Sequence, residues 1–221
     1  MLLTETIKNS TSAIQNRRIA IENKQQSEIY AKALAQLAQA TESIKNSVDC
    51  AATMEEKGIV NTPLMDASTR SDLLACIDDC GNGVSSKRLT LETVKLLKSK
   101  GDALAAQIKV IWRDASQKYS DGPKGYLTII GVLSDDPKQA KDLVDSIAQT
   151  VDGTPSTRAV NCLVSNVEKA KQITNEFSLN AEIEGFLKKV SLQRATVLDL
   201  TPNILTWLRE KNLTSKLKIR F

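Results

Sequence analysis

Apolar and small residues recur in the first part of the chain with the alternating three- and four-residue spacing of a coiled-coil seam. Residues 2–57 contain neither proline nor glycine, so one long helix can run through them. The regular part of the pattern covers residues 30–51, where it consists of Tyr30, Leu34, Leu37, Thr41, Ile44, Val48 and Ala51. We predict that Tyr30, Leu34, Leu37, Ile44 and Val48 form a self-association seam.

The pattern is looser upstream of this seam. Ile7, Ile14 and Ile21 lie seven residues apart, but polar or charged residues stand between them. The apolar face also shifts its phase between Ile21 and Tyr30, which indicates a change in packing partner or a bend. We therefore predict that residues 2–29 pack less tightly than the seam.

Further helices are expected in the middle of the chain. A short helix is predicted over residues 71–80, and the sequence GNG at residues 81–83 is expected to end it. Residues 90–119 repeat the three-four spacing, so this second long helix is expected to fold back antiparallel on the first as a helical hairpin. Gly101 lies in its seam, where it either permits close backbone approach or marks a soft point.

The pattern predicts a small helical bundle after this hairpin. The sequence SDGPKG at residues 120–125 is expected to be a domain boundary. The β-branched residues within positions 126–133 would permit a strand, but we predict a short buried helix because no second strand candidate lies nearby. The other helices of the bundle are expected over residues 137–151, 154–177 and 179–193.

The chain ends with a short helix and a strand-like tail. Thr201 and Pro202 suit the first positions of a helix, and Asn212 followed by Leu213 suits its end. Beyond them, basic and apolar residues alternate as in a strand. The tail either packs on its own bundle or docks on a partner protein. For the second case the predicted partner-binding residues are Trp207, Lys216, Leu217, Lys218, Ile219, Arg220 and Phe221.

Charge concentrates at this end of the chain. The formal net charge is +4, and residues 209–221 hold five basic residues and one acidic residue. A nucleic-acid-binding protein usually spreads a basic stripe over a whole face, because affinity grows with the number of neutralised phosphates. Elsewhere Arg17, Arg18 and Lys24 form a small basic spot that Glu22 interrupts. Nucleic-acid binding is therefore the second hypothesis, after protein binding.

The residue types needed for common catalytic sites are missing. The chain contains no histidine, which excludes histidine triads and the usual zinc and iron sites. It has no GxGxxG or Walker motif either. Cys76 and Cys80 share a helix face but are read as small buried side chains. We expect no catalytic, cofactor-binding or metal-binding residues and no enzymatic activity. The four cysteines occur without a signal-peptide pattern and without a membrane span, which favours a reducing, cytoplasmic setting.

These patterns predict an all-α fold with a long coiled-coil-like hairpin over residues 1–119, a small bundle over 120–200 and a helix with a docking tail over 201–221. This plan is similar to that of many unrelated bacterial accessory subunits, including those that accompany large ATPases or nucleases in phage-defence complexes. Plan alone does not fix function. The expected function is a non-catalytic scaffold or adaptor in a larger assembly, with proteins or further copies of the chain as partners. A nucleic-acid-binding accessory factor is the alternative.

Overall fold

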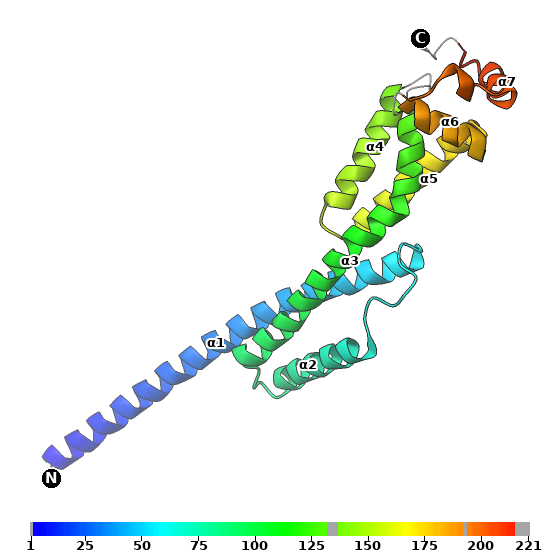
Figure 1. The fold of residues 1–221 in the computed structure, drawn as a ribbon. Coiled ribbons are helices and arrows are strands. Elements are labelled where there is room, and N and C mark those ends of the chain that lie inside the picture. Colours follow the sequence, from blue (N-terminus) through cyan, green and yellow to red (C-terminus); the bar gives the residue numbers. More distant parts are fainter. Residues whose placement is uncertain (1, 132–136, 192–193, 215–221) are drawn as a thin grey trace. The chain divides into compact units, whose positions relative to one another are not determined.

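The fold is entirely α-helical in the part of the chain that is described. The computed structural model describes residues 2–131, 137–191 and 194–214, and within them the side chains of residues 14–131, 137–190 and 194–214. These residues form seven α-helices and one short 3-10 helix, with no strand among them (Figure 1). The predicted all-α fold is confirmed, while the strand-like tail predicted over residues 216–221 lies outside the described residues.

Packing divides the chain into two compact units. The first unit consists of Met1–Val48 and Pro63–Gln107, and the second consists of Asp49–Thr62 and Ile108–Phe221. The first unit holds most of α1 (Leu2–Glu56), all of α2 (Ala67–Ser85) and the first part of α3 (Leu91–Gly131). Each unit is described by itself below.

Three helical segments build the first unit. The hydroxyl of Tyr30 on α1 donates to the carbonyl of Val84 near the end of α2 (3.3 Å), and Ile44 further along α1 packs against Gly101 of α3. Nζ of Lys100, next to Gly101, donates to the carboxylate of Asp72 near the start of α2 (2.8 Å). Helix α2 therefore runs antiparallel to α1, and α3 runs parallel to α1 (Figure 1). The prediction that the second long helix folds back on the first was wrong. The helix that runs antiparallel to α1 is α2, and the second long helix, α3, runs parallel to α1.

Close backbone approach explains Gly101. A Cβ atom at this position would lie 2.6 Å from Cγ1 of Ile44, so a side chain would force the two helices apart. Ala33 and Ala40 are buried on the same helix as Ile44, and their small side chains also let helices approach closely. Of the two interpretations offered for Gly101, the structure supports the close approach.

Helix α2 is longer than predicted. It begins after Asp66, whose carboxylate accepts a hydrogen bond from the Thr69 amide (2.6 Å). It continues through the glycines at residues 81–83 and is followed by Lys87, which adopts a positive φ of 56°. The prediction that these glycines end the helix was wrong. A Cβ at Gly83 would lie 3.1 Å from Cα of Leu89, so this glycine lets the backbone of the segment between α2 and α3 approach α2 closely.

Helix α3 passes without interruption through residues 120–125. The domain boundary expected there does not interrupt the helix, and Pro123 lies inside it. Ser120 is buried and its hydroxyl donates to the carbonyl of Ser116 (2.8 Å), while Leu127 and Ile130 beyond the proline are fully buried. Tertiary packing thus outweighs the local cost of a proline, which removes one backbone hydrogen bond. Residues 126–131 are helical as predicted, but they are the end of α3 and not a separate short helix.

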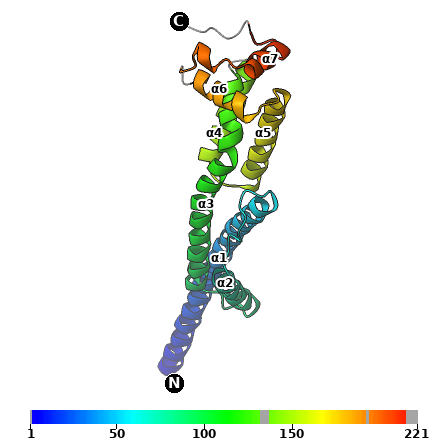
Figure 2. The ribbon, with the colours of Figure 1, turned by 45° about the vertical axis from the view of Figure 1, so that its right-hand side comes forward.

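The rest of the second unit is a set of shorter helices. They are α4 (Pro137–Asp152), α5 (Thr157–Glu176), α6 (Ala181–Ser191), the 3-10 helix η1 (Val197–Asp199) and α7 (Pro202–Glu210). The amide of Asn166 on α5 donates to the hydroxyl of Ser146 on α4 (2.9 Å). A hydrophobic cluster joins α3, α6 and α7 and contains Ile130, Ile183, Phe186, Leu187, Ile204, Trp207, Leu208 and Leu213. Figure 2 shows these helices from a second direction.

The starts of α5 and α6 differ from the prediction. Ser156 caps α5 by accepting from the Ala159 amide (3.1 Å), two residues after the predicted start at Thr154. The third helix was predicted to start at residue 179, directly after Ser178, but the φ of 51° at Ser178 places it in the turn that ends α5. An N-cap residue normally adopts an extended backbone, which a residue with this φ does not have. Asn180 takes the role instead, since its Oδ1 accepts from the Ile183 amide (2.9 Å).

Within the described residues, every helix is too short or too polar to span a lipid bilayer.

Candidate interaction surfaces

Residues 14–29 of α1 are exposed on every side. The first side chain of α1 in this region with any substantial burial is Tyr30. Figures 1 and 2 both show this N-terminal part of α1 continuing past α2 and past the start of α3 in its unit. Four isoleucines lie in it with more than half of their surface exposed, namely Ile14, Ile19, Ile21 and Ile29. We call residues 14–29 the N-terminal segment.

Three of these isoleucines form a stripe. Ile14 and Ile21 are seven residues apart, and Ile29 follows eight residues later. Successive residues of an α-helix are turned by about 100°, so these side chains share one face of α1. The stripe lies roughly 90° around the helix from the face that buries Ala33 and Ile44. The predicted phase shift is confirmed, and the stripe does not continue the buried seam.

Polar groups border this stripe without covering it. Shallow depressions run along it, one of them lined by Ile14, Arg17, Arg18, Ile21, Glu22 and Gln25. The next is lined by Gln25, Glu28, Ile29 and Lys32. Nε of Arg18 lies 3.2 Å from Oε1 of Glu22 in a solvent-exposed ion pair one turn apart. Such a pair contributes little stability.

The residues of the predicted self-association seam occupy different environments. Ile44 is buried with 5% exposure, whereas Tyr30, Leu37 and Val48 are half-buried and Leu34 is 37% exposed. Ala33 and Ala40 take the buried positions that the pattern had given to Leu34 and Thr41. Self-association through these five residues stays a prediction, and within one chain only part of the seam is used.

The sequence analysis missed a second apolar stripe, which lies on α2. Leu74 is 53% exposed, and Ile77 and Val84 are also exposed. With Gly81 they repeat the spacing of three, four and three residues. The spacing was visible in the sequence, but the predicted end of the helix at residue 80 hid it. We call Leu74, Ile77, Gly81 and Val84 the α2 stripe.

The described part of the C-terminal region is packed on its own chain. Trp207 is 5% exposed, and its Nε1 donates to the carbonyl of Phe177 (2.7 Å), so its ring is not available to a partner. Thr201 and Pro202 open α7 as predicted, and Asn212 has the expected positive φ of 55°. The other predicted partner-binding residues lie outside the described residues, namely Lys216, Leu217, Lys218, Ile219, Arg220 and Phe221.

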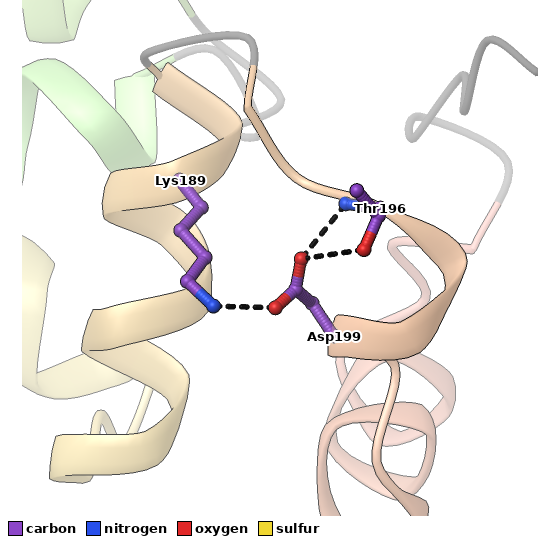
Figure 3. A network of polar contacts seen from close by, with 3 residues as sticks. All are labelled: Lys189, Thr196 and Asp199. Atoms are coloured by element: carbon purple, nitrogen blue, oxygen red, sulfur yellow. Dashed lines mark hydrogen bonds and ion pairs between the residues drawn. The ribbon is translucent and has the colours of Figure 1, made fainter.

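A polar network ties α6 to η1 (Figure 3). The carboxylate of Asp199 accepts from Nζ of Lys189 (2.5 Å) and from the backbone amide and hydroxyl of Thr196 (2.8 and 2.9 Å). The Lys189 ammonium, followed by the two Thr196 donors, lowers the pKa of Asp199 to about 2. The network therefore links Lys189 on α6 to η1 and the residue that precedes it.

The cysteines and carboxylates of the described part of the chain do not assemble into a metal site. There, His, Cys, Asp and Glu residues do not gather in groups of three that could hold a metal ion. Cys50, Cys76 and Cys80 are buried, and burial raises the pKa of the Cys50 and Cys80 thiols, which disfavours the reactive thiolate. Cys162 is exposed as a free thiol. The candidate interaction surfaces in the described part of the chain are the two apolar stripes.

Comparisons with protein-family models, with curated proteins and with solved structures find no match for this chain.

Proposed function

We propose that this chain is a non-catalytic scaffold or adaptor subunit of a larger protein assembly. It binds its partners through its N-terminal helices and through its C-terminal tail. The observation that carries the proposal is the exposure of the N-terminal segment, where Ile14 is 70% exposed and its whole helical turn faces solvent.

Physical chemistry explains why this segment calls for a partner. Most helical stability in proteins comes from packing an apolar face, and a helix without such packing is marginal in water. Burying an isoleucine side chain is worth about 1.5–3 kcal/mol. Packing a second surface against a row of exposed isoleucines would therefore be favourable. Exposed apolar patches of this kind are typical of interaction sites.

The charges on the segment suit a protein surface better than nucleic acid. Arg17, Arg18 and Lys24 are basic, but Glu22 and Glu28 alternate with them, and Glu22 pairs with Arg18. A phosphate backbone would meet this mixed surface with partial repulsion. The nucleic-acid-binding alternative rests on the three basic residues and predicts binding that weakens steeply as salt rises.

A pair of double variants tests the proposal. Ile14→Asp with Ile21→Asp places charges on the stripe, whereas Asn16→Asp with Asn23→Asp adds the same number of charges on the opposite face of the same exposed segment. The full chain is expressed in its own host, and the size of its assembly is measured by sedimentation velocity. The stripe variant is expected to lose the assembly and the control to keep it.

An assembly of unchanged size in the stripe variant would refute a binding role for this segment. Electrophoretic mobility shifts with single- and double-stranded DNA and RNA, at low and high salt, test the alternative. Tight binding to a nucleic acid by the wild type and by both variants would favour the accessory factor over the scaffold.

A further inference from the structure

We draw no further inference here: the strongest candidate, the apolar groove between the end of α3 and the start of α4 in the second unit, which is lined mainly by Leu127, Gly131, Pro137, Ala140 and Val144, carries none because nothing in the structure shows what covers it.

Discussion

The two parts of α1 within the first unit differ in a way that composition alone does not reveal. The N-terminal segment carries the large residues Ile14 and Ile21, yet these are exposed. The following part carries Ala33 and Ala40, which are small but buried. Burial follows from the presence of a neighbouring helix, and small residues allow that neighbour to approach. In the proposed function, the large apolar residues without a neighbour in the chain are the contact surface for a partner.

The largest expected effect comes from placing the same charge in the two parts of α1. Ile44→Asp buries a carboxylate next to Gly101 and should lower the free energy of unfolding by several kcal/mol. Ile14→Asp leaves the charge in water and should change it by less than about 0.5 kcal/mol. Urea unfolding at low protein concentration measures both. Equal losses in the two variants would contradict the difference in burial on which the comparison depends.

The C-terminal region allows a second comparison, between the buried Trp207 and the predicted docking tail. Trp207→Ala removes a buried ring and its hydrogen bond to Phe177, so it should cost about 3–5 kcal/mol. Deleting residues 216–221 is expected to leave the melting temperature of the isolated chain nearly unchanged while weakening its assembly, if the tail docks on a partner. Thermal melting and sedimentation of both variants check this. A clear drop in melting temperature on deletion would assign the tail to the chain's own core.

A third comparison is between Gly101, which packs closely against another helix, and Gly81, which lies in open space. Gly101→Ala adds a methyl group 2.6 Å from Ile44 and should destabilise the first unit by about 1–3 kcal/mol. Gly81→Ala adds one in open space inside a helix, so it should stabilise the chain by up to about 1 kcal/mol. Thermal melting of each variant gives the sign. Stabilisation by Gly101→Ala would show that α1 and α3 can separate without cost.

The smallest expected effect is a dependence on pH. The pKa of Asp199 in the folded state is about 2, below its ordinary value of about 3.9. Its contribution to the free energy of unfolding is therefore complete above about pH 5 and disappears as the pH falls towards 2. Asp199→Asn should remove this part of the acid dependence.

Urea unfolding of the second unit, followed by the fluorescence of its two buried tryptophans, Trp112 and Trp207, between pH 2.5 and 6, measures the difference. The gap in stability between wild type and Asp199→Asn should narrow as the pH falls. A gap that is constant over this range would show that the network of Asp199 with Lys189 and Thr196 does not persist in solution.

Local signals in the sequence predicted local structure correctly. The cap at Thr201 with Pro202, the left-handed Asn212 and the phase shift before Tyr30 were all found as expected. Each depends on side chains within a few residues of one another, so their chemistry is independent of the distant chain. The exposure of the N-terminal segment was foreseen in part, as looser packing.

Features that depend on distant contacts were predicted wrongly. The glycines at residues 81–83 and the proline at 123 would end helices in isolation, but buried neighbours such as Cys80 and Leu127 keep both helices continuous. The direction of α3 could not be read from its periodicity, because an apolar face is the same whether its partner runs parallel or antiparallel. The α2 stripe was overlooked because its helix was predicted to end too early.

The sequence by itself determined that the chain is helical, where most helices begin and which faces of them are apolar, since these depend on residue type and spacing. Only the tertiary structure decided which apolar faces are covered within one chain. That choice depends on the direction of α3 and on the close approach that Gly101 allows beside Ile44. Whether an apolar face is buried depends on the element that packs against it as well as on the face itself. The exposed stripes on α1 and α2 could therefore be identified only from the tertiary structure.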